Sequence, residues 1–250
     1  MTSECWAASL GGCSDKITGE HILTRGIFPH DEIFIQGLHW CADKPKLIGL
    51  ASLTAKILCS KHNSGLSEMD TAAIQTAKAF REALDLRDFR ERHKRTHWTR
   101  RRFQINGYQL ESWFLKTLID IGYKGLLPIG SDSSEPGRAS DSLIETAFGL
   151  RRFIKPAGLY TVARVGEENF TDGRVRIITL STAAGRIGGA IFHFGGLRYL
   201  LYLEKNRSPH PNDFVGLEGQ KIQASQFMYH LRQVKFPVHG RLSHTIDFQW

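Results

Sequence analysis

The spacing of apolar side chains divides the chain into a helical middle and a strand-rich second half. Residues 71–95 contain no glycine or proline, and small or apolar residues recur there at three- to four-residue intervals. This period predicts an amphipathic helix, which we expect to begin near Ser64. A second apolar stripe runs from Leu110 to Ile121 and predicts another helix, packed in a core.

Beyond residue 151 the pattern changes to short runs of β-branched and aromatic residues between turn residues, which is typical of strands. The expected strands cover residues 159–165, 175–180, 187–194, 199–203 and 245–250. A strand or turn is expected at 102–108 and a short helix at 223–234, and the Pro-, Gly- and Ser-rich segment 127–142 predicts a linker. The pattern therefore indicates an α+β fold with a mostly antiparallel C-terminal sheet.

Composition narrows the class of protein. Hydrophobic residues make up 41% of the 250 residues and charged residues 23%, which is ordinary for a folded soluble chain. No apolar run reaches the roughly 18–20 residues that cross a bilayer, so a transmembrane protein is excluded. The N-terminus lacks the pattern of a secretory signal, and four cysteines are too few for a disulfide scaffold, so we expect a cytoplasmic protein.

Positive charge is concentrated in one segment. The net charge is +8, yet residues 1–75 hold 6 basic and 8 acidic residues, whereas residues 76–102 hold 10 basic and 4 acidic residues. The densest part contains Arg90, Arg92, Lys94, Arg95, Arg100, Arg101 and Arg102. Such a run predicts contacts with the phosphate backbone of a nucleic acid. The alternatives are a solvated helix face, or pairing with acidic groups of the C-terminal region or of a partner chain.

All four cysteines lie in the first 75 residues. The sequence from Cys59 to His62 reads C-x-x-H, which places a thiolate and an imidazole one tight turn apart, as two ligands of a tetrahedral zinc ion would be. Cys5 and Cys13 could supply the other two ligands. We expect Cys41 to be a small buried residue, although it could replace Cys5 or Cys13 at the zinc.

A second group of polar residues has the chemistry of a catalytic site. Glu20 directly precedes His21, and Asn63 and Asp70 lie at i and i+7 on one face of the helix expected to follow the C-x-x-H segment. A carboxylate on that face could meet Glu20 and His21 around a divalent cation.

In this order the two groups resemble the HNH (His-Asn-His) endonucleases, in the branch written roughly E-H-I-I-P … C-x-x-C-N-x-x-L-x-x-x-D. The matching segments are Glu20-His21-Ile22-Leu23 and the twelve residues from Cys59 to Asp70. The resemblance covers about residues 1–75 and implies a zinc-stabilised ββα-metal fold, in which a hairpin carries the His and a helix carries the Asn. The chain departs from that pattern where seven residues separate Cys5 from Cys13 and where His62 replaces a cysteine.

The resemblance also implies a role for each residue. His21 would be the general base that takes a proton from the attacking water, which suits a neutral imidazole near neutral pH. Glu20 and Asp70 would hold one Mg²⁺ or Mn²⁺ ion, because hard oxygen ligands suit these ions. Asn63 would orient the His21 loop by hydrogen bonds or contribute to the metal site.

These observations predict three segments: an HNH-type nuclease module over 1–75, a basic helical connector over 76–126, and a β-rich domain over 143–250. The leading hypothesis is a metal-dependent endonuclease, a phosphodiester hydrolase that acts on DNA. It could serve as a bacterial antiviral-defence or toxin-type effector whose C-terminal domain senses a protein partner or forms a homo-oligomer. The alternative is a non-catalytic zinc protein that binds nucleic acid or supports assembly on the same scaffold.

Overall fold

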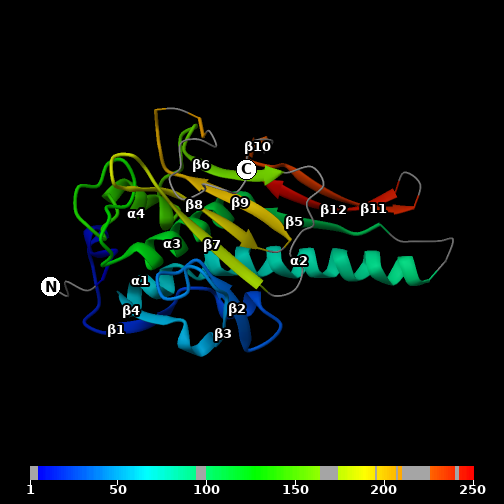
Figure 1. Ribbon diagram of the computed structural model, residues 1–250, viewed down its shortest axis with the longest axis horizontal. Helices are drawn as coiled ribbons and strands as arrows, with labels where there is room; N and C mark the ends of the chain where they lie inside the picture. Colours follow the sequence, from blue (N-terminus) through cyan, green and yellow to red (C-terminus); the bar gives the residue numbers. More distant parts are fainter. Residues whose placement is uncertain are drawn as a thin grey trace.

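The computed structural model describes residues 5–93, 100–163, 174–194, 196–206, 208–209, 226–239 and 242–250. Along the chain, short N-terminal strands come first, helices occupy the middle, and strands return towards the C-terminus (Figure 1). The fold is of the mixed α+β class and contains more sheet than helix. No helix in the described part of the chain is both long and apolar enough to cross a membrane.

The first strand, β1 (Ile17–His21), pairs antiparallel with β4 (Thr54–Cys59) in a sheet of their own. Helix α1 (Ser60–Gly65) starts directly after β4, and α2 (Ser67–Arg92) follows after one residue. The helix predicted from the apolar period is thus confirmed as α2. Three single-turn 3-10 helices complete this region: η1 (Ala8–Leu10), η2 (Arg25–Ile27) and η3 (Leu50–Ser52).

The largest sheet contains seven strands in the order β10-β6-β9-β8-β7-β2-β3. Their bounds are β2 (Glu32–Gln36), β3 (Lys46–Gly49), β6 (Gly158–Ala163), β7 (Arg174–Ser181), β8 (Ile187–Phe194), β9 (Leu197–Tyr202) and β10 (Gln226–Tyr229). All neighbours are antiparallel except β2 and β7, which run parallel. Two strands from the first 75 residues therefore extend a sheet that is otherwise built by the C-terminal half.

A smaller sheet has the order β11-β12-β5, with β11 (Gln233–His239), β12 (Leu242–Gln249) and β5 (Arg102–Asn106). Strand β5 runs parallel to β12, so the segment after the basic run is joined to the C-terminal strand. The strands expected at 102–108 and at the C-terminus are confirmed. Both sheets draw strands from both halves of the chain.

Helix α3 (Gly107–Gly122) lies at the centre and contacts α2, α4 (Asp141–Ala147) and strands of both larger sheets. The Asn106 side chain accepts a hydrogen bond from the backbone N–H of Gln109 (3.1 Å) and so caps the helix. Trp113 and Phe114 are 1% and 0% exposed, so they are core residues, as the apolar stripe predicts.

The short helix expected at 223–234 is wrong for the described residues. Residues 226–229 form β10 and residues 233–239 form most of a β11–β12 hairpin. Phe227 and Tyr229 alternate with polar or less bulky residues, which is a two-residue period, and Tyr229 packs on Tyr160 of β6 (5.1 Å between ring centroids). Pairing with β6 therefore decides the structure of this segment.

Candidate metal centre and catalytic site

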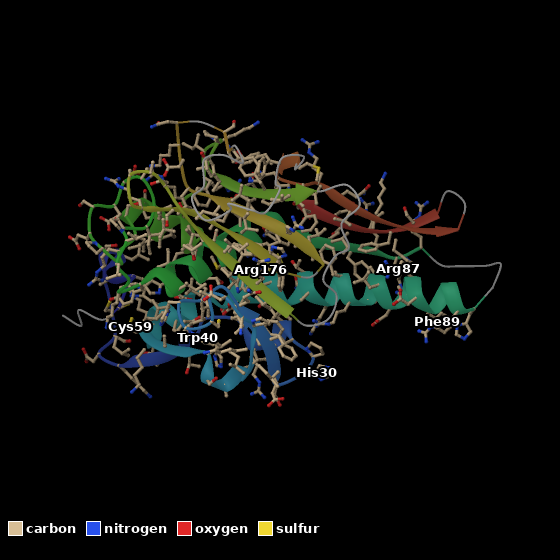
Figure 2. The ribbon with its side chains drawn as sticks, viewed as in Figure 1. His30, Trp40, Cys59, Arg87, Phe89 and Arg176 are labelled. Atoms are coloured by element: carbon tan, nitrogen blue, oxygen red, sulfur yellow. The ribbon has the colours of Figure 1, made fainter. Side chains whose placement is uncertain are left out.

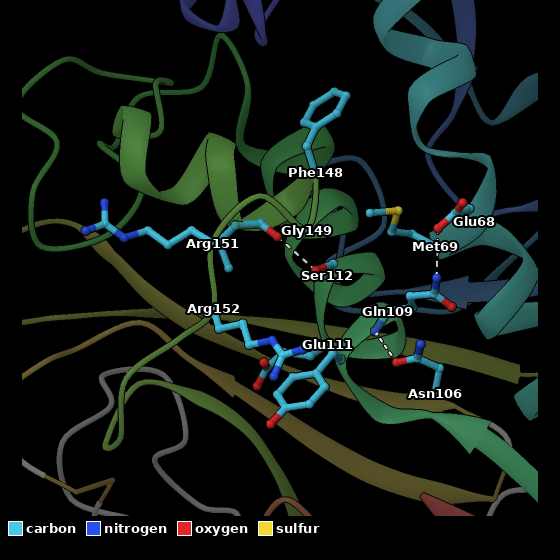
Figure 3. A pocket seen from close by; sticks show the side chains of 12 residues that line it. Glu68, Met69, Asn106, Gln109, Glu111, Ser112, Phe148, Gly149, Arg151 and Arg152 are labelled. Atoms are coloured by element: carbon cyan, nitrogen blue, oxygen red, sulfur yellow. Dashed lines mark hydrogen bonds between the residues drawn. The ribbon is translucent and has the colours of Figure 1, made fainter. Parts of the chain in front are cut away.

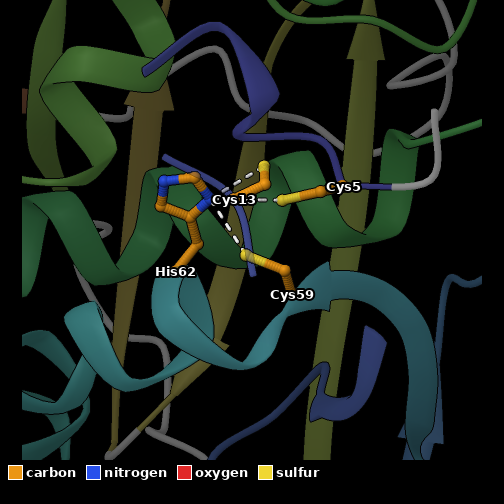
Figure 4. A group of neighbouring side chains, drawn as sticks. All are labelled: Cys5, Cys13, Cys59 and His62. Carbon is orange, nitrogen blue, oxygen red and sulfur yellow. Dashed lines mark hydrogen bonds between the residues drawn. The ribbon is translucent and has the colours of Figure 1, made fainter. Parts of the chain in front are cut away.

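Four predicted zinc ligands converge at the N-terminal edge of the fold. Cys5 precedes η1, Cys13 follows it, Cys59 ends β4, and His62 lies on the first turn of α1. Their ligand atoms all lie within 4.8 Å of one another (Figure 4). The turn from strand β4 into α1 brings Cys59 and His62 together, because the C-x-x-H spacing fits one helical turn.

The spacing of these atoms fits a tetrahedral zinc site. The His62 Nδ1 atom lies 3.3 Å from Cys5 Sγ, 3.6 Å from Cys13 Sγ and 3.3 Å from Cys59 Sγ. Zinc bond lengths of about 2.3 Å to sulfur and 2.0–2.1 Å to nitrogen imply a separation of about 3.6 Å in a tetrahedron. The Cys₃His set can therefore hold a metal ion such as zinc. Cys41 is buried, and among the described residues it is not part of this cluster.

Electrostatics favour a thiolate at one of these positions. Burial raises the pKa of Cys59, but hydrogen bonds from the backbone of His62 and Ser14 more than offset this and lower it to about 6. Burial instead raises the pKa of Cys5 to about 12. A bound cation would take the place of the Cys5 proton, since metal binding to cysteine releases protons.

Asn63 joins α1 to the strand that carries His21. Its Nδ2 atom donates hydrogen bonds to Thr18 Oγ1 (3.0 Å) and to the carbonyl oxygen of Gly19 (3.4 Å). Both acceptors lie on β1, immediately before Glu20 and His21. The side chain of His21 is half-buried at the end of β1, where it pairs with Thr54 of β4. Asn63 is thus positioned to fix the strand that presents His21.

Glu20 and Asp70 also meet, and the cation between them is a side chain. The ammonium of Lys116, on α3, contacts the Glu20 carboxylate and lies 3.4 Å from Asp70 Oδ1. It donates a further hydrogen bond to the carbonyl oxygen of His21 (3.1 Å) and lies 3.7 Å from Asp120 Oδ2. Lys116 is 0% exposed. One buried cation therefore holds the end of β1, the start of α2 and the middle of α3 together.

Burial dominates the ionisation of this cluster. It raises the pKa of Glu20 and of Asp120 above their ordinary values, and the positive charge of Lys116 only partly opposes this. Burial also lowers the pKa of Lys116, but the three carboxylates around it more than offset that effect. The Lys116 pKa lies above its ordinary value, so the side chain carries a full positive charge.

The surroundings of Glu20 and Asp70 fit a divalent cation by charge. Three carboxylates surround one ammonium, and the buried Asp120 Oδ2 has no hydrogen-bond partner among the described residues. Uncompensated buried charge is costly, and carboxylate oxygens are the ligands that Mg²⁺ prefers. The Asp70 side chain is 26% exposed, so it is the member of the pair that solvent can reach.

Lys116 and Asp120 are the residues that the sequence pattern did not single out. They stand at i and i+4 in a helix otherwise dominated by Leu, Ile, Trp and Phe, and Trp6 Nε1 donates a hydrogen bond to Asp120 Oδ1 (2.8 Å). A Lys–Asp pair on the apolar stripe of a core helix was the available signal, because such charges are buried only when they are paired.

The basic segment lies at the other end of α2 from the zinc ligands. Figure 2 shows Cys59 near the start of the helical region and Arg87 near the far end of α2. Arg102 pairs with Asp247 of β12, and Arg101 Nε lies 3.9 Å from Glu82. Arg92 and Arg100 are exposed, whereas Lys94, Arg95 and the side chain of Arg90 lie outside the described part of the chain.

A pocket of about 210 Å³ opens between the starts of α2 and α3 and the segment after α4 (Figure 3). Glu68 accepts a hydrogen bond from Gln109 on one wall, and Arg151 and Arg152 lie on another. Phe148 lines the pocket and also packs edge-on against the His62 ring (5.6 Å between centroids). The pocket therefore adjoins the Cys₃His cluster through one aromatic side chain.

Comparisons with protein-family models, with curated proteins and with solved structures give no match to this chain. The functional argument therefore depends on the residues themselves and on their geometry.

Proposed function

We propose that this protein is a metal-dependent HNH-type endonuclease that hydrolyses phosphodiester bonds in nucleic acid, with DNA as the expected substrate. The observation that carries the proposal is the pair of hydrogen bonds from Asn63 to β1, directly before Glu20 and His21. An Asn on the helix that braces the His-bearing strand is the role that the HNH resemblance implies.

Each residue has a separate task in the proposed reaction. His21, half-buried at the end of β1, takes the proton from the attacking water. Asn63 and the Lys116 ammonium fix its strand from two sides, through Gly19 and through the His21 carbonyl. Glu20 and Asp70 would hold Mg²⁺ or Mn²⁺, which when bound supplies positive charge for the scissile phosphate and the leaving oxygen.

The basic segment would carry the substrate. Asp70 and Arg92 are 22 residues apart on α2, which corresponds to about 33 Å along the helix axis. One turn of duplex DNA is about 34–36 Å long. A duplex lying along α2 would therefore contact the exposed Arg92 and Arg100 about one turn away from His21. Such phosphate contacts position the substrate and carry no sequence information.

A second candidate is a non-catalytic zinc protein that binds nucleic acid. It is favoured by the contact of Lys116 with Glu20 and Asp70, since an ammonium already compensates both proposed metal ligands. The two candidates differ in cleavage, because the binding protein would bind DNA but leave the backbone intact.

The test is nicking of supercoiled plasmid by the zinc-loaded protein with and without Mg²⁺. We expect nicking that EDTA stops and that Mg²⁺ restores, with zinc content measured before and after. His21→Ala should lower the rate about 10²–10⁴-fold with the fold and DNA binding retained. His30→Ala, at an exposed position, is the matched control and should cleave normally. Undiminished cleavage by His21→Ala would contradict the proposal, and DNA binding without cleavage would favour the second candidate.

A further inference from the structure

Lys116 is the most completely buried charge in the described part of the site. Its side chain is 0% exposed, and its ammonium contacts three carboxylates and one carbonyl oxygen. A buried ammonium is stable only where negative groups surround it with good geometry. The surroundings of Lys116 meet that requirement, so the side chain is part of the site and not an accident of packing.

Two of its partners are the proposed ligands of the divalent cation. Lys116 contacts Glu20 through Oε1 and Asp70 through Oδ1, so one oxygen of each carboxylate already faces a positive charge. A metal ion bound between the same carboxylates would lie within a few ångströms of the ammonium. Like charges at that distance repel strongly in a region of low dielectric constant. The ammonium and a divalent cation therefore oppose each other at Glu20 and Asp70.

Two features still favour a second cation. The three carboxylates exceed the single ammonium in charge, and Asp70 remains partly open to solvent. Mg²⁺ is commonly bound by one or two protein carboxylates together with the phosphates of a substrate. A phosphate brought to this place would add negative charge and metal ligands, and would offset the repulsion by Lys116.

We propose that Lys116 is the resident cation of the Glu20–Asp70 pair in the free protein, and that a divalent metal ion binds tightly there only together with a phosphate of the nucleic acid. This inference deepens the proposed function and rests on it in taking Glu20 and Asp70 as the metal ligands. It makes metal loading conditional on substrate. The free protein would then hold its zinc without carrying a loaded hydrolytic centre.

The first experiment measures Mn²⁺ binding by electron paramagnetic resonance, with zinc-loaded full-length protein and no nucleic acid. We expect weak binding by the wild type and at least about tenfold tighter binding by Lys116→Met, which removes the opposing charge. Adding Asp70→Asn to that variant should return the affinity to the wild-type value. Lys78→Met, at an exposed position of α2, is the matched control and should bind like the wild type. Equal affinities in the wild type and Lys116→Met would overturn the inference.

A second measurement needs no variant, so it remains decisive if Lys116→Met fails to fold. The ¹⁵N NMR signal of the buried Lys116 ammonium should not change when Mg²⁺ alone is added. It should shift when Mg²⁺ is added with a phosphorothioate oligonucleotide that resists cleavage, and Mn²⁺ affinity should rise in the same mixture. A shift with Mg²⁺ alone, or a Mn²⁺ affinity that the oligonucleotide leaves unchanged, would overturn the inference. Neither readout involves cleavage, so failure of the nuclease proposal is seen separately in the plasmid assay.

Discussion

Removing one ligand of the Cys₃His cluster should weaken zinc binding without greatly disturbing the packing around it. Cys13 is the best position, because it is half-buried in a loop, whereas Cys5 and Cys59 are 1% and 0% exposed. Serine at this position keeps the size of the side chain and removes the thiolate. Cys41→Ser is the matched control, since Cys41 is a cysteine of the same region that lies outside the cluster.

The magnitude follows from the four similar ligand positions. Structural zinc in small modules contributes about 10–16 kcal/mol of binding free energy at neutral pH. If the four ligands that converge here share it equally, loss of Cys13 costs about 3 kcal/mol. This corresponds to roughly a hundredfold weaker zinc binding. For a chain of this size the same free energy lowers the melting temperature by about 6–12 °C.

Competition with a colour-forming chelator gives the zinc affinity, and differential scanning calorimetry gives the melting temperature. We expect Cys13→Ser to lose zinc to the chelator at about hundredfold lower chelator concentration, with Cys41→Ser retaining one equivalent. The reasoning would be refuted if Cys13→Ser kept its zinc with unchanged affinity, or if Cys41→Ser were the variant that lost it.

Two further predictions concern charge. Burial, reinforced by the charge of Arg176, lowers the pKa of His193 from 6.5 to about 4, so its stabilising contribution is complete above pH 6.5 and is lost as pH falls towards 4. In urea titrations over this range, the wild type should lose up to about 3 kcal/mol more stability than His193→Gln, and parallel curves would contradict this. Arg100→Ala should flatten the log–log salt dependence of DNA binding by about 0.9, and Arg102→Ala, which is paired with Asp247, by less. An unchanged slope in Arg100→Ala would contradict a phosphate contact there.

The grouping of zinc ligands could be predicted from the sequence because the chemistry of the residue types is specific. Cys59 and His62 are joined by one helical turn, and a cysteine elsewhere in a loop-rich region has few reasons other than metal binding to approach them. The same holds for Asn63, which acts on residues of the strand that β4 pairs with. Local spacing carries this information, so a single sequence was enough.

Lys116 could not be predicted in the same way, because its partners are distant along the chain. Its bond to His21 spans 95 positions, and in the helical pattern Lys116 reads as an ordinary polar interruption of an apolar stripe. The strands β2 and β3 were missed for a similar reason. Residues 32–49 are short and irregular in pattern, and they become strands because β7 and β2 pair, across about 140 residues of sequence.

The sheet that β2 and β3 extend has a consequence for how this protein can be dissected. The chain leaves β1, adds β2 to β7, and returns to β4, so both strands of the His21 hairpin are tied to the C-terminal half. A fragment ending near residue 75 would lose Lys116 and leave the β7-facing edge of β2 unpaired. Open strand edges recruit other chains, so such a fragment is expected to self-associate. The unit to express, cross-link or transplant is the whole polypeptide, although its chemistry is confined to a few residues near one end.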